Sequence, residues 1–321
     1  MNQFRILGKD LRVSAIGLGI MGMDHAYGGA ADRGEMAELI RYALEQGCNF
    51  FDTAPIYGQA NEILLGEAVK HCREQAVIAT KFGIVGQTHS AAGLDNQLDS
   101  RPESIRRQVE QSLKNLQTDY IDLYYQHRID PNVAPEAVAQ VMGELIGEGK
   151  IRHWGVSNAP EDYMARAHAV TPLTATENQY SMVFRQPERS LFDFCAERNI
   201  GFVAYSPLGN GFLSGRFNAS SEYADGDFRR TMKRFSADVM ANNQPVLDFL
   251  HELAAAKSAT AAQIVLAWEL AQRDFIVPIP GTTKKHRLAE NLGALQIRLT
   301  AEELHTINAK LNEMDIDESH F

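Results

Sequence analysis

Residues 49–58 read NFFDTAPIYG, a short apolar run that ends in Asp52 and leads into a turn carrying Tyr57. Two further segments have the same form, VIATKF at residues 77–82 and DLYYQHR at residues 122–128. Each apolar run predicts a strand, and a polar, titratable side chain stands at or just beyond its end. In a barrel of parallel strands the carboxyl ends share one face, where active sites are built. The pattern therefore gathers four side chains on that face: Asp52, Tyr57, Lys81 and His127.

Short apolar runs alternate with helical patterns through most of the chain. Strands are predicted at Ala15–Leu18, Asn49–Asp52, Val77–Thr80, Ile121–Tyr125, His153–Val156, Thr174–Glu177, Gly201–Ala204 and Phe275–Pro278. Helices are predicted between them, at Glu35–Gln46, Ile63–His71, Pro102–Leu116, Glu136–Glu148, Pro160–His168, Glu188–Arg198 and Ala261–Gln272. Alternation of strand and helix predicts an α/β fold with a parallel sheet, and eight such units that close on themselves give a (β/α)8 TIM barrel.

Three segments outside this alternation add to the expected fold. Phe4–Ile6 and Leu11–Val13 predict a β-hairpin that would plug the amino-terminal end of the barrel. Residues 83–99 and 206–244 predict two long loops on the catalytic face, and loops of such length are usually functional. Because no linker interrupts the pattern, residues 1–321 are expected to form a single domain.

The composition is that of a soluble globular protein, with 45% hydrophobic and 22% charged residues. The net charge of −10 and the absence of a basic stripe argue against nucleic-acid or membrane partners. The first residues lack the apolar stretch of a signal peptide. The three cysteines are scattered, which predicts a reducing cytoplasmic location with neither a disulfide framework nor a metal site.

The four side chains at the strand ends suggest proton transfer to a carbonyl group. Tyr57 would be the acid, and the Lys81 ammonium, held by Asp52, would lower the pKa of Tyr57. His127 would donate a hydrogen bond to the carbonyl oxygen. Singly, each residue has a simpler explanation: a rim tyrosine, a solvated lysine, a half-buried histidine or a capping aspartate. Their joint occurrence at successive strand ends favours the functional interpretation.

Several motifs resemble the aldo-keto reductase family, in order and over most of the chain. They are Gly17–Gly19, 51–66, Ala79–Lys81, Gly155–Asn158, Asn178–Gln179, Ala204–Gly209 and Ile279–Thr283. The segment QHRID at residues 126–130 is similar to the bacterial, plant and fungal branch that includes pyridoxal reductase-like and auxin-induced-type proteins. The resemblance implies a (β/α)8 barrel that binds NADP(H) without a Rossmann fingerprint, and this chain has no such fingerprint.

The resemblance also implies a role for each matching residue. Tyr57 looks like the general acid, Lys81 and Asp52 like the pair that tunes it, and His127 like the residue that orients the carbonyl. The nicotinamide end of the cofactor is expected at Ile20, Met21, Ser157, Asn158, Gln179 and Tyr205, with Tyr205 stacked on the ring.

The phosphate and adenine contacts are expected in two later segments. The pyrophosphate is expected at Ser206, Leu208, Gly209 and Arg216, and the 2′-phosphate and adenine at Gly281, Thr282, Thr283, Arg287, Glu290 and Asn291. Many family members have a lysine where this chain has Gly281, so the preference for NADPH would rest on Arg287 and the two threonines.

These features predict NADPH-dependent reduction of an aldehyde or ketone substrate. Two other functions fit parts of the pattern: a slow-turnover, NADP(H)-binding regulatory subunit that resembles potassium-channel β subunits, and an aldolase that uses Lys81 as a Schiff base. The sequence leaves the substrate and the oligomeric state open.

Overall fold

Eight parallel strands form the central sheet of the protein, in the order β12-β11-β10-β9-β8-β5-β4-β3. The structure is a computed structural model that describes residues 3–24, 27, 31–90, 93–218 and 220–319. The strands are β3 (Leu18–Gly19), β4 (Phe50–Asp52), β5 (Val77–Phe82), β8 (Ile121–Gln126), β9 (Ile151–Ser157), β10 (Ala175–Gln179), β11 (Gly201–Tyr205) and β12 (Ile276–Pro278).

The first and last strands of this sheet meet and close it. The Gly17 amide donates a hydrogen bond to the Pro278 carbonyl at 2.9 Å, and Gly19 pairs with Gly281 in an isolated parallel bridge. The predicted TIM barrel is therefore confirmed. The first barrel strand was predicted three residues too early, because Ala15 still belongs to the preceding hairpin and bonds to the carbonyl of Gln3.

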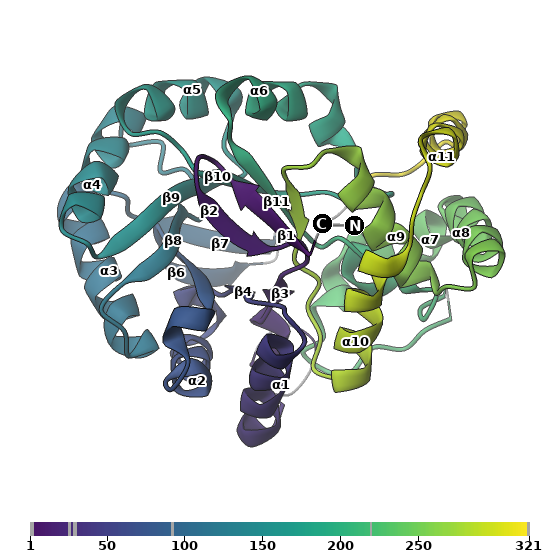
Figure 1. Ribbon diagram of the computed structural model, residues 1–321, viewed down its shortest axis with the longest axis horizontal. Coiled ribbons are helices and arrows are strands. Elements are labelled where there is room, and N and C mark those ends of the chain that lie inside the picture. Colours follow the sequence, from purple (N-terminus) through teal and green to yellow (C-terminus); the bar gives the residue numbers. More distant parts are fainter. Residues whose placement is uncertain (1–2, 25–26, 28–30, 91–92, 219, 320–321) are drawn as a thin grey trace.

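Helices surround the barrel, as Figure 1 shows. Those that match predicted helices are α1 (Arg33–Glu45), α2 (Gln59–Val69), α3 (Pro102–Leu116), α4 (Pro135–Gly147), α5 (Glu161–Val170), α6 (Leu191–Arg198) and α9 (Ala261–Gln272). The others are α7 (Ala237–Asn242), α8 (Gln244–Lys257), α10 (Lys285–Gly293) and α11 (Ala301–Glu313). Among the described residues, no helix has both the length and the apolar character needed to cross a membrane.

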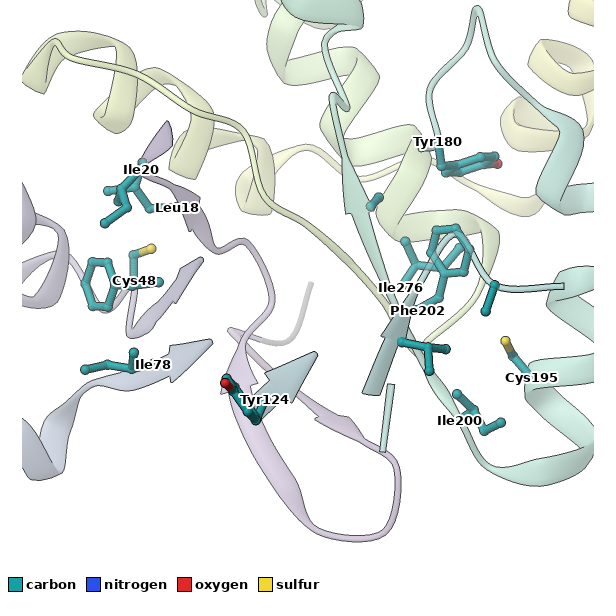
Figure 2. Close-up of a cluster of buried hydrophobic side chains, with 14 of the residues drawn as sticks. Leu18, Ile20, Cys48, Ile78, Tyr124, Tyr180, Cys195, Ile200, Phe202 and Ile276 are labelled. Carbon is teal, nitrogen blue, oxygen red and sulfur yellow. The ribbon is translucent and has the colours of Figure 1, made fainter. Parts of the chain in front are cut away.

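Side chains alternate between the two faces of each barrel strand, which produces two separate apolar layers. The outer layer packs against the helices, and Figure 2 shows Ile78, Tyr124, Phe202 and Ile276 within it. The inner layer fills the barrel with the sequence neighbours of these residues: Ala79, Tyr125, Val203 and Val277. Strand residues two positions further along the inner face therefore point into the barrel mouth.

A β-hairpin closes the amino-terminal end of the barrel, as predicted. Its strands are β1 (Phe4–Leu7) and β2 (Leu11–Ser14), drawn in purple across the sheet in Figure 1. Leu7, Leu11 and Val13 belong to the same apolar cluster as the inner barrel residues. The remaining open end is the face where the strands terminate.

Both predicted loops contain regular structure. Residues 83–99 form an antiparallel hairpin of β6 (Ile84–Ser90) and β7 (Gly93–Leu98), with residues 91–92 outside the described part of the chain. The sequence predicted a long connection there without its conformation, because a hairpin with exposed faces lacks the apolar alternation that signals a strand. Residues 206–244 contain α7 and three short 3₁₀ turns.

Candidate active site

Lys81 lies at the centre of the site, fully buried at the end of β5. Its Nζ donates to Asp52 Oδ1 at 2.5 Å and to the Thr53 carbonyl at 3.0 Å. A second carboxylate, Glu177 Oε2, lies 3.3 Å from the same nitrogen. Asp52, Lys81 and Glu177 come from β4, β5 and β10, and each occupies the inner face one step above the apolar layer of the barrel.

Tyr57 and His127 lie beside this cluster, so the structure brings together the four side chains that were predicted to meet. Tyr57 ends the 3₁₀ turn η2 (Pro55–Tyr57), which directly follows β4. Lys81 Nζ is 5.4 Å from the centre of the Tyr57 ring. The Tyr57 and His127 rings meet edge to face, with centroids 6.0 Å apart. A small group at the barrel mouth could contact both side chains.

The proton affinity of Tyr57 differs from the sequence-based prediction. Burial raises the pKa of Tyr57 above its ordinary value, and the nearby Lys81 ammonium lowers it only in part. Asp52 and Glu177 raise the pKa further, because their charges offset that of Lys81. The expected net lowering was therefore wrong. Tyr57 keeps its proton near neutral pH, as a proton donor must.

The charge states of the two neighbouring groups follow from the same physics. Burial, reinforced by Lys81 and Arg128, lowers the pKa of His127 well below its ordinary value, so the imidazole is neutral. Burial alone would lower the pKa of Lys81, but Asp52 and Glu177 together raise it, so Lys81 stays charged. The site thus holds a neutral hydrogen-bonding imidazole and a fixed ammonium.

A second group of polar residues lines the opposite side of the mouth, at the ends of β9, β10 and β11. Asn158 Nδ2 donates to Ser157 Oγ at 2.8 Å, and the Tyr205 hydroxyl donates to Asn158 Oδ1 at 3.1 Å. Gln179 is the strand partner of Tyr205 in the parallel register. Asn158 follows β9 in the left-handed conformation, with φ of 51°, which turns its side chain back over the strand end.

Gln179 offers a direct test of whether a nicotinamide fits here. Its side chain is only 4% exposed, yet none of the described residues accepts a hydrogen bond from its Nε2. A buried donor without a partner is unfavourable, so such groups usually meet a ligand or an ordered water. The carboxamide oxygen of a nicotinamide is an acceptor of the required kind. The residues present therefore fit the predicted cofactor.

The segment after β11 holds the residues that were predicted for the pyrophosphate. Ser206 and Gly209 both have positive φ, at 52° and 56°, which folds the chain tightly over the barrel mouth. Leu208 packs against the outer apolar cluster. Arg216 is exposed, with its guanidinium 5.6 Å from the centre of the Phe217 ring.

A different arginine of this region, Arg234, is completely buried. Its Nη1 donates to Asn210 Oδ1 at 3.1 Å, whereas its Nε and Nη2 have no acceptor among the described residues. Asn210 in turn donates to Ser206 Oγ at 3.2 Å. Sequence inspection missed Arg234, because a short stretch rich in Lys and Arg normally indicates a solvated surface.

The segment predicted for the 2′-phosphate and adenine lies at the seam of the barrel. A Cβ atom on Gly281 would lie 3.0 Å from the Gly19 carbonyl, which explains why a residue without a side chain stands there. Thr282 Oγ1 accepts from the Lys284 amide at 3.1 Å. Arg287, in α10, pairs with Glu290 at 2.6 Å. The remaining predicted residues of this end are half-buried Thr283 and buried Asn291.

The other two predicted cofactor residues follow β3. The Ile20 amide donates to the Asp52 carbonyl at 3.0 Å, and the Ile20 carbonyl accepts from Asn61 Nδ2 at 3.0 Å. Met21 begins the next 3₁₀ turn and is half-buried. The backbone of this segment is thus fixed directly beside Asp52.

Glu177 is the residue of the site that sequence inspection overlooked. The strand alternation could have revealed it, because Ala175, Glu177 and Gln179 must share one face of β10. A glutamate between an inner-face alanine and a predicted ligand residue has to point into the barrel.

The fold and the site together define a (β/α)8-barrel protein with a buried group of titratable side chains at the mouth of the barrel. The family model described as "Aldo/keto reductase family" matches residues 15–312. The chain belongs to this family, and the protein is therefore an oxidoreductase that acts on carbonyl compounds.

Individual relatives agree with this assignment. A probable aldo-keto reductase 1 of Glycine max is 39% identical over 301 residues, which cover 93% of this chain and 86% of that protein. The glycerol dehydrogenase AKR11B4 from Gluconobacter oxydans superimposes with a TM-score of 0.86 at 27% identity, over 98% of this chain and 96% of that one. An aldo/keto reductase from Klebsiella pneumoniae, solved with NADP and acetate, superimposes with a TM-score of 0.75 at 25% identity, over 99% of this chain and 100% of that one.

Proposed function

We propose that the protein reduces aldehydes or ketones to alcohols with NADPH, the cofactor form used by its family, and that Tyr57 is the proton donor. One observation carries the proposal: a protonated Tyr57 lies beside both a fixed ammonium and a neutral imidazole at the only open end of the barrel that the described residues form. A carbonyl oxygen placed between Tyr57 and His127 would meet two hydrogen-bond donors.

Each residue has its own role in the proposed reaction. NADPH, when bound, supplies a hydride to the carbonyl carbon. His127 donates a hydrogen bond that orients and polarises the carbonyl, and Tyr57 gives its proton to the oxygen. Lys81 then stabilises the phenolate that remains, because an adjacent positive charge favours the ionised form of a phenol.

The rest of the mouth would hold the cofactor. Ser157, Asn158 and Gln179 would hydrogen-bond the carboxamide, and Tyr205 would stack on the nicotinamide and so orient the ring toward the substrate. The segment from Ser206 to Arg216 covers the pyrophosphate. Residues 281–291 take the 2′-phosphate and adenine, with the charge of Arg287 favouring NADPH over NADH.

Replacing Tyr57 by Phe tests this proposal, because it removes one hydroxyl and little volume. NADPH-loaded protein is mixed with an aromatic aldehyde, and cofactor oxidation is followed by stopped flow. We expect Tyr57→Phe to lower kcat by about 10²–10⁴-fold, the usual contribution of a general acid, while the Kd of NADPH changes by less than about twofold.

Two outcomes would contradict the proposal in different ways. Equal turnover in Tyr57→Phe and the natural protein would remove Tyr57 from the reaction. If the natural protein oxidised NADPH no faster than the solvent background across a panel of aldehydes and ketones, the slow regulatory-subunit alternative would be favoured instead.

We further propose that residues 1–321 fold as one domain and that the protein is cytoplasmic. The amino-terminal hairpin shares the barrel's inner core, and the three cysteines are free thiols, two of them buried. A single calorimetric unfolding transition would support the first point. Cell fractionation would test the second.

A further inference from the structure

A lysine and two carboxyl groups are enclosed together at the top of the barrel interior. Lys81 Nζ lies 2.5 Å from Asp52 Oδ1 and 3.3 Å from Glu177 Oε2. Lys81 is 0% exposed, and Asp52 and Glu177 are each 3% exposed. If both acids were ionised, Lys81 would face two carboxylates, and these three side chains together would carry a net negative charge. Such a charge is strongly unfavourable without water.

The free oxygens of the two acids have few partners. Asp52 Oδ2 accepts no hydrogen bond from the described residues, and Glu177 Oε2 has only its ion pair with Lys81. The two carboxyl groups nevertheless lie within hydrogen-bonding reach of each other. Two carboxylates cannot form such a bond, because both are acceptors only, whereas a carboxylic acid and a carboxylate can. A single proton would satisfy both acids and remove the excess charge.

We propose that Asp52 and Glu177 share one proton, and that Glu177 is a positioning residue that acts on Tyr57 through Lys81. This inference rests on the proposed function. With the proton in place the cluster is neutral, and only one negative charge opposes the Lys81 ammonium. The Tyr57 O–H bond breaks as a new O–H bond forms on the substrate oxygen, and the phenolate keeps the electron pair. A second ionised carboxylate would oppose that phenolate.

The groups that face this acid pair come from every side of the mouth. They are Lys81 of β5, Tyr57 of η2, Tyr125 of β8 and Tyr205 of β11. His127 and Arg128 follow β8: His127 faces Lys81, and Arg128 faces Tyr57 and Tyr205. Burial, aided by the mutual repulsion of the acids, raises the pKa of Glu177. Burial likewise raises the pKa of Asp52, against the opposing effect of Lys81. Because the tyrosines also stay protonated, the acid pair is the group expected to titrate first as the pH rises.

Infrared difference spectroscopy detects a protonated carboxyl group without any turnover. Besides the shared pair, the fully buried Glu269 of α9 has no partner among the described residues and would give a separate signal. We expect two carbonyl bands in the natural protein at neutral pH. Glu269→Gln removes one band, and Glu177→Gln removes the other, because Asp52 alone beside Lys81 ionises.

The pH dependence of kcat tests the coupling to Tyr57. In Glu177→Gln the amide can donate to Asp52 Oδ2 and keeps the cluster neutral at every pH, so the alkaline fall of kcat should move up by at least about one pH unit. Glu177→Leu leaves Asp52 Oδ2 without a donor and should lower kcat with little change in KM for the aldehyde. Recovery of kcat in Glu177→Gln relative to Glu177→Leu identifies the hydrogen bond as the cause. Far-ultraviolet circular dichroism establishes that each variant is folded.

The two measurements separate this inference from the function on which it rests. If Glu177→Gln loses the carbonyl band but the natural protein reduces no carbonyl compound, the shared proton is supported and the proposed function is contradicted. If the natural protein shows a single carbonyl band and Glu269→Gln removes it, Asp52 and Glu177 do not share a proton. An unchanged alkaline limb in Glu177→Gln would overturn the coupling to Tyr57.

Discussion

The phenol of Tyr57 shows how a buried site balances two opposing effects. Lys81 alone favours the phenolate, as inspection of the sequence indicated, but burial and the two acids beside Lys81 favour the phenol. The identity of the residues could be predicted, whereas the balance could not, because it depends on how far each group is removed from water. Glu177 changes that balance, and the alternation of side chains along β10 would have placed it on the inner face.

Arg287 carries a prediction about cofactor choice. Its guanidinium lies at the first turn of α10 and pairs with Glu290 at 2.6 Å, with 47% of the side chain exposed. A lost charge-assisted hydrogen bond costs about 1.5–3 kcal/mol, so Arg287→Ala should weaken NADPH binding by about tenfold to a hundredfold. NADH binding, measured by the same fluorescence titration, should change by less than about twofold. Arg189→Ala, at an arginine 76% exposed, serves as the control. Equal losses for both cofactors would remove Arg287 from the 2′-phosphate site.

At the scale of elements, α9 contains a carboxyl group that the proposed reaction does not use. Glu269 is fully buried, and burial raises its pKa well above the ordinary value. An acid whose pKa is higher in the folded than in the unfolded state contributes stability that is present at acid pH and is lost as the pH rises. Glu269→Gln should therefore match the natural protein near pH 4 and exceed its stability at neutral pH, by about 1–3 kcal/mol.

Chemical denaturation at a series of pH values measures this difference. The control is Glu252→Gln on the neighbouring helix α8, where the carboxyl is exposed. A stability difference that stayed constant between acid and neutral pH would show that Glu269 remains ionised in the folded protein.

The β6–β7 hairpin marks the limit of pattern-based prediction at this scale. Strands of the barrel were predictable because each is an apolar run buried by helices on one side and by the barrel core on the other. The hairpin stands away from both, and Val85 within it is 51% exposed. Its pairing is specified by backbone hydrogen bonds, which leave no trace in the composition. The same holds for the short turns between residues 206 and 244.

For the whole molecule, the barrel itself could be predicted from the alternation of strands and helices. The contacts that close it could not be read from a pattern, because β3 has only two residues and meets the segment of β12 through Gly17 and Gly19. Backbone contacts join the seam, and glycines on both sides allow the two segments to approach.

The hairpin at the amino-terminal end should stabilise the whole barrel without affecting its chemistry. Leu7 is fully buried and packs so tightly that a Cβ atom on Gly201 would lie 2.4 Å from it. Leu7→Ala should lower the free energy of unfolding by about 2–5 kcal/mol, as for other large-to-small core changes. Urea denaturation measures this loss. Ile6→Ala, at a neighbour 47% exposed, should cost far less, and kcat should stay within about twofold in both. A large fall in kcat for Leu7→Ala would contradict this expectation and show that the hairpin affects the active site.

A barrel sealed at one end by β1 and β2 has a consequence for the proposed function, because cofactor and carbonyl compound would have to share one mouth. The residues proposed to hold the nicotinamide line the strand ends themselves, whereas the loops that would border the substrate rise above them. If the nicotinamide binds as proposed, it is the deeper ligand. NADPH would then bind before the carbonyl compound, and the oxidised cofactor would leave after the alcohol.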